Sequence, residues 1–257
     1  MVRSEVHHVM YGPLVALVVV ALAACGKSEV PTTPCERDAK LEVRIVDNDA
    51  PFMKKLFAHV GSEGREGRPR DPAAIEAGVR ADIDAWRTEQ VTANGFPRDS
   101  QRETDYYLLA LDRPALDRYL ASYERPPDDR EIRIEFVAAR PDVEYLEARA
   151  HWRTYYVMKE SMLDNREIGD VELATNPVTE GPMLVFELTS EGKRAFAKGT
   201  AATVGKKVAT MIDGAILSAP IINGAITGGR FSINLPTQVA AEALLAKLRC
   251  ASHRHRE

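Results

Sequence analysis

Residue types that serve as catalysts occur in this sequence without the spacing that catalysis needs. Ser218 precedes Ala219-Pro220, and neither a Gly-x-Ser-x-Gly elbow nor a Ser-x-x-Lys motif surrounds it. Asp82 and Asp84 share one face of a predicted strand, which suits acid–base catalysis, but they alternate with apolar residues as on a solvated sheet face. The sequence therefore predicts no catalytic residues, and we expect that the protein is not an enzyme.

Binding sites for phosphate, metals and nucleic acids are not predicted either. The run Gly228-Gly229-Arg230 lacks the strand–loop–helix context and the Gly-Lys-Ser/Thr ending of a phosphate loop. His253 and His255 supply two ligands in a C-terminal tail, too few for a structural metal site. The net charge of −4, with both signs mixed along the chain, argues against a nucleic-acid partner. We expect no cofactor and no metal.

The N-terminus has the pattern of a processed export signal. Arg3 precedes an apolar run at 14–24, which is shorter than the roughly 20 residues that a membrane-spanning helix needs. The tetrad Leu22-Ala23-Ala24-Cys25 resembles a lipoprotein cleavage box. We therefore predict a signal peptide at 1–24 and a lipid on Cys25, firm enough to tether the protein to a membrane. A degenerate anchor helix from about Val9 to Ala24 is the alternative.

The residue after Cys25 bears on the choice of membrane. In the sorting rules that such lipoproteins resemble, an aspartate at this position often retains the protein in the inner membrane, and here the residue is Gly26. We therefore expect a protein of the cell envelope that faces the periplasm, with the outer membrane favoured over the inner. Residues 25–40 are predicted to form the tether.

The other two cysteines, Cys35 and Cys250, lie near opposite ends of the remaining chain. The periplasm permits disulfides, and a bridge between them would contribute about 4 to 5 kcal/mol in the chain-entropy model. Two unpaired thiols in the tails are the alternative.

Hydrophobic periodicity predicts two α+β units. Period-2 alternation and helical spacing predict strands at 41–45, 79–85, 106–111 and 132–136, with helices after Asp49 and after Asp112 as N-caps. This β-α-β-β-α-β order is typical of a ferredoxin-like unit, which we assign to residues 41–140 as the base. The second unit, at 141–249, has a strand at 184–188, a helix capped by Ser190, a hairpin about Asp213-Gly214 and a helix at 237–248. A tail follows at 250–257.

The second unit resembles a known family. The segment Val204–Pro220, with Phe186–Gly192 before it and Gly228-Gly229-Arg230 after it, is similar to the head of the first periplasmic domain of SecD, the accessory subunit of the bacterial protein-export machinery. The segments at 41–53 and 104–108 resemble the SecD base less specifically. The resemblance implies a ferredoxin-like base followed by a head that holds emerging unfolded preprotein.

The resemblance implies a non-enzymatic, tethered module that binds unfolded or exported polypeptide and assists Sec-dependent translocation, with that polypeptide or components of the Sec translocon as partners. SecD continues into membrane spans that couple proton flow to transport, and this sequence ends at Glu257, so we expect a module without that motor. An apolar stretch near the hairpin is the candidate peptide-binding region, since its edge could accept a strand. It comprises Ile216, Leu217, Ile221, Ile222 and Ile226. A scaffold or adaptor that docks on another envelope complex is the alternative.

Overall fold

A computed structural model describes residues 39–61, 71–88, 101–139 and 149–253. The predicted signal peptide, Cys25 and Cys35 lie outside these residues, and the side chain of Cys250 is not described. The lipid on Cys25 and the Cys35–Cys250 disulfide therefore stay predictions. Within the described ranges, no helix is long and apolar enough to cross a membrane.

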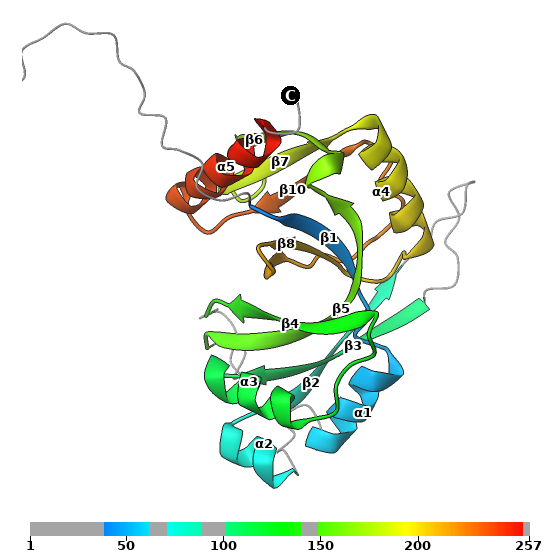
Figure 1. The fold of residues 1–257 in the computed structure, drawn as a ribbon, viewed down its shortest axis with the longest axis vertical. Coiled ribbons are helices and arrows are strands. Elements are labelled where there is room, and N and C mark those ends of the chain that lie inside the picture. Colours follow the sequence, from blue (N-terminus) through cyan, green and yellow to red (C-terminus); the bar gives the residue numbers. More distant parts are fainter. Residues whose placement is uncertain (1–38, 62–70, 89–100, 140–148, 254–257) are drawn as a thin grey trace, which may run out of the picture. The chain divides into compact units, whose positions relative to one another are not determined.

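The chain folds into helices and strands in a mixed order, which confirms the predicted α+β class (Figure 1). The elements are β1 (Leu41–Val46), α1 (Pro51–Val60), α2 (Pro72–Ala77), β2 (Arg80–Thr88), β3 (Gln101–Ala110), α3 (Arg113–Ser122), β4 (Arg130–Val137), β5 (His151–Asp164), η3 (Asn165–Glu167), β6 (Ile168–Thr175), β7 (Pro182–Leu188), α4 (Ser190–Ala202), β8 (Val208–Ile212), β9 (Ala215–Ser218), β10 (Arg230–Asn234) and α5 (Gln238–His253). The first part follows the predicted β-α-β-β-α-β order, with α2 added.

The strands form two antiparallel sheets. The larger has the order β2-β3-β5-β1-β8-β9, with β4 paired to β5 as well, and the smaller has the order β10-β7-β6. Strand β5 is 14 residues long, so it can pair with three neighbours. It pairs with β3 near Trp152, with β4 from His151 to Met158, and with β1 from Val157 to Asp164. The place between β3 and β4 is thus taken by β5, and the segments predicted as base and head share one sheet.

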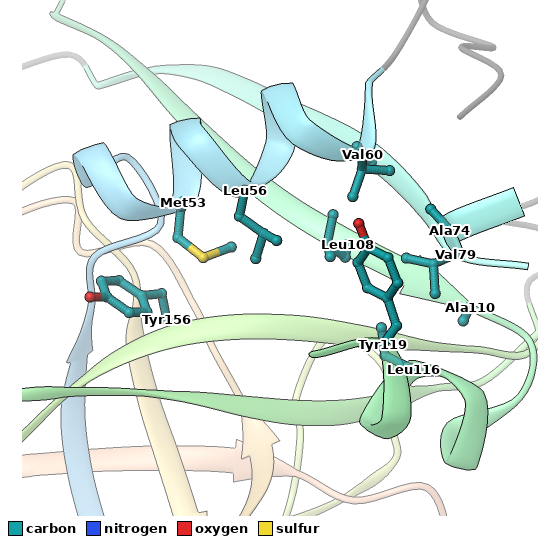
Figure 2. Packing of buried hydrophobic residues seen from close by; sticks show 11 residues of the cluster. Met53, Leu56, Val60, Ala74, Val79, Leu108, Ala110, Leu116, Tyr119 and Tyr156 are labelled. Atoms are coloured by element: carbon teal, nitrogen blue, oxygen red, sulfur yellow. The ribbon is translucent and has the colours of Figure 1, made fainter. Parts of the chain in front are cut away.

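The first core lies between the sheet and the helices α1, α2 and α3 (Figure 2). Each fully buried aliphatic side chain in it contributes about 1.5 to 3 kcal/mol through loss of water contact. The core includes Met53, Leu56, Val60, Leu108, Leu116, Tyr119 and Tyr156. Asp112 caps α3 as predicted, since its side chain accepts a bond from the Ala115 amide. The predicted Asp49 cap of α1 is wrong, because α1 begins after Ala50 and Asp49 lies near the ammonium of Lys206 instead.

A second core lies where α5 packs against β6 and β7. It contains Leu184, Phe186 and Leu245, and the Phe186 ring stacks on Phe231 with centroids 4.6 Å apart. Helix α4 is capped by Thr189 and not by the predicted Ser190, since the Thr189 hydroxyl accepts a bond from the amide of Gly192.

Candidate functional site

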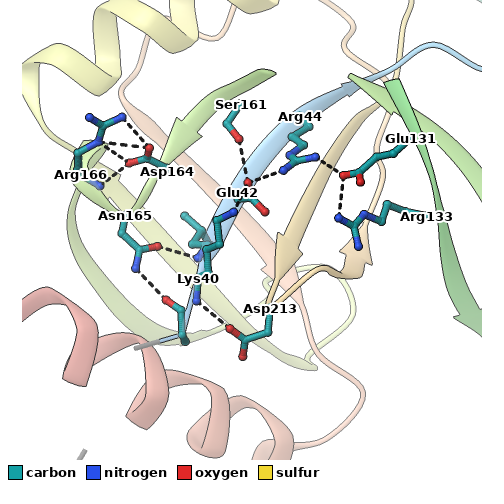
Figure 3. A network of polar contacts seen from close by, with 12 residues as sticks. Lys40, Glu42, Arg44, Glu131, Arg133, Ser161, Asp164, Asn165, Arg166 and Asp213 are labelled. Carbon is teal, nitrogen blue, oxygen red and sulfur yellow. Dashed lines mark hydrogen bonds and ion pairs between the residues drawn. The ribbon is translucent and has the colours of Figure 1, made fainter. Parts of the chain in front are cut away.

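The β8–β9 hairpin turns at Asp213-Gly214, as predicted. Both residues have positive φ, 50° and 80°, which a two-residue primed turn requires. The turn is held to the start of β1, because the amide of Asp213 donates to the Lys40 carbonyl and its carboxylate accepts from the Lys40 amide at 2.9 Å (Figure 3). The hairpin, whose strands belong to the larger sheet, is therefore fixed at its turn to the start of β1.

A groove of about 960 Å³ lies between this turn, strand β4 and helix α3. Its α3 wall includes Asp117, Leu120 and Ala121, and its opposite wall is the turn from Asp213 to Ile216. Strand β4 lines the groove from Arg130 to Phe136, apart from Glu135. Strand β4 pairs with β5 and with no other strand of the described chain, and strand β9 lies within 8 Å of β4, measured between Cα atoms, without pairing with it.

One face of β4 gives the groove an apolar side. Ile132 and Ile134 are half-buried and pack against the first core. Phe136 is 54% exposed, and its ring lies 5.0 Å from that of Trp152. The guanidinium of Arg113 lies over the Trp152 ring at 5.2 Å. An aromatic cluster with a stacked cation thus lies at one end of the groove.

The other face of β4 is polar (Figure 3). Arg133 donates to Glu131 at 2.8 Å, and Glu131 also accepts from Arg44, which bonds Glu42 at 2.5 Å. Burial raises the pKa of Glu42, but hydrogen bonds and charge from Arg44 and Lys40 outweigh burial and hold that pKa below its ordinary value. The Nε atoms of Arg44 and Arg133 are buried without a hydrogen-bond partner in the described structure. This side of the groove is therefore lined by a network of paired charges.

The predicted peptide-binding stretch is only partly at this groove. Ile216 lines it, but Ile216 and Ile222 are 7% and 1% exposed and pack in cores, so they offer little surface. Leu217, Ile221 and Ile226 are half-buried. The stretch also has less free backbone than strand addition requires, because Pro220 and Ile222 already bond the segment from Gly205 to Val208. We therefore replace this stretch with the β4 groove as the candidate site.

Sequence analysis missed the residues that make the groove. Ile132, Ile134 and Phe136 were assigned to a strand, and Trp152 to the start of the second unit. Their alternation is the same for a central strand and an edge strand, so it carried no sign that one side would stay unpaired. The exposure of the Phe136 ring is visible only in the structure, so the sequence held no signal for this strand.

The carboxylate of Asp84, predicted to lie on a solvated face, belongs instead to an ion cluster. It lies 2.8 Å from Arg153 and 3.4 Å from Lys207. Both cations also contact Asp105, and the Arg153 guanidinium lies 3.6 Å from the centre of the Tyr107 ring. Burial raises the pKa of Asp84, but the charges of Arg153 and Lys207 lower this pKa by a larger amount. The pKa of Asp84 is therefore below its ordinary value. This arrangement is that of a structural ion cluster.

No group of three His, Cys, Asp or Glu side chains in the described ranges could hold a metal ion. His255 lies outside those ranges, and the side chain of His253 is not described.

Comparisons with known proteins relate the second half of the chain to one family. Residues 143–252 match the family model of the SecDF P1 head subdomain. This part of the chain is therefore similar to the head of a SecD-type periplasmic domain. Protein translocase subunit SecD of Treponema pallidum is 37% identical over 95 residues, which are 37% of this chain and 16% of that protein. SecD of Sebaldella termitidis is 47% identical over 53 residues, 21% of this chain and 13% of that protein.

The chain thus spans less than a fifth of the length of these two SecD proteins. Among solved structures, a chain of SecDF, described as a membrane component that enhances protein export, is 19% identical with a TM-score of 0.35. That likeness covers 82% of this chain and 94% of the SecDF chain.

Proposed function

We propose that this SecD-type domain binds unfolded or exported polypeptide in the β4 groove and thereby assists Sec-dependent translocation, without enzymatic activity. The observation that carries the proposal is the groove beside β4, which has one apolar and one polar side. The relatives are protein translocase subunits, which supports a function in the same process.

A protein that handles many exported chains cannot rely on one side-chain sequence. Binding must come mainly from groups that every polypeptide has, which are the amides and carbonyls of the main chain. A sheet edge supplies such groups, and apolar side chains beside it add sequence-tolerant contact. In the β4 groove the side chains of Ile132, Ile134 and Phe136 supply the second of these contacts.

The alternative is an adaptor that docks on one envelope complex. The exposed Phe136, next to Trp152 and Arg113, favours it, because aromatic and arginine side chains are typical anchors of protein interfaces. The two functions differ in how many partners contact the groove.

Site-specific photo-crosslinking in living cells distinguishes these functions. The crosslinking residue replaces Ala121, an exposed residue of the groove wall, and the matched control replaces Arg118, which is exposed on the same helix away from the groove. We expect Ala121 to trap many exported polypeptides and to lose them when export is stopped. One stable partner at Ala121 would support the adaptor, and equal crosslinking at both positions would contradict a binding groove.

We also propose that a lipid on Cys25 tethers the domain at the outer membrane, facing the periplasm. The Leu22-Ala23-Ala24-Cys25 box and Gly26 support this proposal. Labelling with a fatty-acid analogue should mark the wild-type protein and not Cys25→Ser. Separation of the two membranes by density should place the labelled protein with the outer membrane, and label in the inner-membrane fraction would contradict the placement.

A further inference from the structure

The sequence contains two Asn-Gly pairs, and Asn223-Gly224 is the one that the structure describes. The other pair, Asn94-Gly95, lies outside the described residues. In an Asn-Gly pair no Cβ on the second residue hinders its backbone nitrogen. The nitrogen of Gly224 can therefore reach the carboxamide carbon of Asn223, and two groups held in one short segment react far faster than two separate molecules.

Asn223-Gly224 lies in the connection between β9 and β10, outside any helix or strand. Asn223 is exposed, and a Cβ placed on Gly224 would meet no atom within 4 Å. Among the described residues, none forms a hydrogen bond with the Asn223 side chain or the Gly224 amide. The two groups can therefore rotate into the geometry of attack without breaking a contact of the fold.

The residues on either side of this pair are anchored. Ile222 is 1% exposed, and its amide donates to the Lys206 carbonyl at 2.8 Å. The Ile226 amide donates to the hydroxyl of the buried Thr200 at 2.8 Å. The segment from Asn223 to Ala225 is thus a short link between fixed ends, so a change in its covalent structure leaves both ends in place.

The Asp213-Gly214 pair of the hairpin has the opposite setting. The Asp213 carboxylate accepts a bond from the Lys40 amide at 2.9 Å, and the Asp213 amide donates to the Lys40 carbonyl (Figure 3). Gly214 has a φ of 80°, and a Cβ there would lie 3.1 Å from the Arg133 guanidinium. Attack by the Gly214 nitrogen would have to break these contacts, so the fold protects this pair.

We propose that Asn223 is a modification site at which the folded protein deamidates. The Gly224 nitrogen loses its proton and bonds to the Asn223 carboxamide carbon. The bond from that carbon to the side-chain nitrogen breaks, and ammonia leaves behind a cyclic succinimide. Water then opens the ring at either carbonyl, which yields aspartate or isoaspartate and adds one negative charge. This inference is independent of the proposed function.

The test incubates the full chain at mildly alkaline pH, in buffer and in denaturing urea. Peptide mapping by mass spectrometry detects the exchange of amide for carboxyl at Asn223, and chromatography separates the aspartate and isoaspartate peptides. We expect both products, with a rate in the folded chain within fivefold of the rate in urea. A rate in the folded chain that is more than fivefold lower would overturn the inference, because it would show that the fold holds Asn223.

A matched Asn-Gly pair can be placed in the same molecule. Asp213→Asn creates this pair in the hairpin turn, where asparagine suits the backbone as well as aspartate does. We expect the new pair to deamidate at least fivefold more slowly than Asn223-Gly224, with circular dichroism confirming that the variant folds. A smaller difference would contradict the protection that we assign to the turn and the exposure that we assign to Asn223.

Gly224→Ala tests the chemical path. Gly224 does not have a positive φ and has open space around it, so alanine fits there without strain. The added methyl group hinders attack by the backbone nitrogen, so deamidation at Asn223 should slow at least fivefold. A rate equal to that of the wild type would rule out the succinimide.

Discussion

Lys207 and Asp105 form a buried ion pair that joins the entrance of β8 to strand β3. Asp105 is 2% exposed and also accepts a bond from Arg153 on β5 at 2.7 Å. The three residues come from segments that the sequence assigned to different units. One buried carboxylate therefore links the two parts of the main sheet.

Removal of this carboxylate should strongly destabilise the fold. Asp105→Asn would leave Arg153 and Lys207 with less compensating charge in a buried setting, which typically costs about 3 to 5 kcal/mol. Urea unfolding measures the change. The control is Lys55→Met, which breaks an exposed pair with Glu124 and should change the unfolding free energy little. Equal effects of the two substitutions would contradict a structural role for the cluster.

Acid should destabilise the protein below about pH 4. Burial raises the pKa of Asp47, but hydrogen bonds and charges from Lys206 and Arg130 lower this pKa by a larger amount. The folded-state pKa of Asp47 therefore lies below the ordinary 3.8. Asp84 has the same direction of shift. A carboxyl with a lowered folded pKa stabilises the fold above its ordinary pKa, and this contribution is lost as pH falls through the folded value.

Melting temperatures measured from pH 7 to pH 2.5 test this dependence. The wild type should lose stability mainly below pH 4, and Asp47→Asn should show a shallower loss because one of the shifted groups is gone. A steeper acid dependence in Asp47→Asn would rule out this account of the Asp47 carboxyl.

Two glycines of helix α4 should respond differently to alanine. Replacement of glycine inside a helix gains about 1 kcal/mol from propensity. At Gly192 an added Cβ would lie 2.6 Å from the carbonyl oxygen of Glu167, whose backbone cannot move easily, so we expect a net loss of about 1 to 3 kcal/mol. At Gly199 the Cβ would meet the flexible end of Met162 at 2.7 Å, so the change should stay within about 1 kcal/mol. Thermal unfolding of both variants measures these changes. A Gly192→Ala variant that is more stable than the wild type would contradict the close packing of Gly192 against Glu167.

The cap of α4 can be tested in the same way. Thr189→Ala removes the hydroxyl that bonds the Gly192 amide and should cost about 1 kcal/mol. Ser190→Ala is the control, because Ser190 is exposed and lies inside the helix, where the change should be near neutral. Urea unfolding measures both changes. A larger loss of unfolding free energy from Ser190→Ala than from Thr189→Ala would show that Ser190 is the N-cap.

The disulfide predicted between Cys35 and Cys250 has a direct chemical test. Alkylation of the denatured chain should modify neither cysteine before reduction and both after it, as mass spectrometry would show. A reductant should lower the unfolding free energy by up to about 4 to 5 kcal/mol, and Cys35→Ser should not respond to the reductant. Modification of both thiols without reduction would establish two unpaired cysteines.

The amino-acid sequence by itself determined the local features of this protein. The Asp213-Gly214 turn, the cap at Asp112 and the chain order of strands and helices all depend on residues a few positions apart, so their patterns are visible in the sequence. The SecD resemblance also came from continuous motifs, and it agrees with the family match at residues 143–252.

Only the tertiary structure decided how distant segments pair. Periodicity assigns a residue to a face of a strand but does not name the neighbouring strand, because backbone hydrogen bonds are the same for every sequence. The place of β5 between β3 and β4, the groove beside β4 and the Lys207–Asp105 pair all follow from long-range pairing. The candidate site therefore moved from the hairpin stretch to the groove between β4, α3 and the Asp213-Gly214 turn.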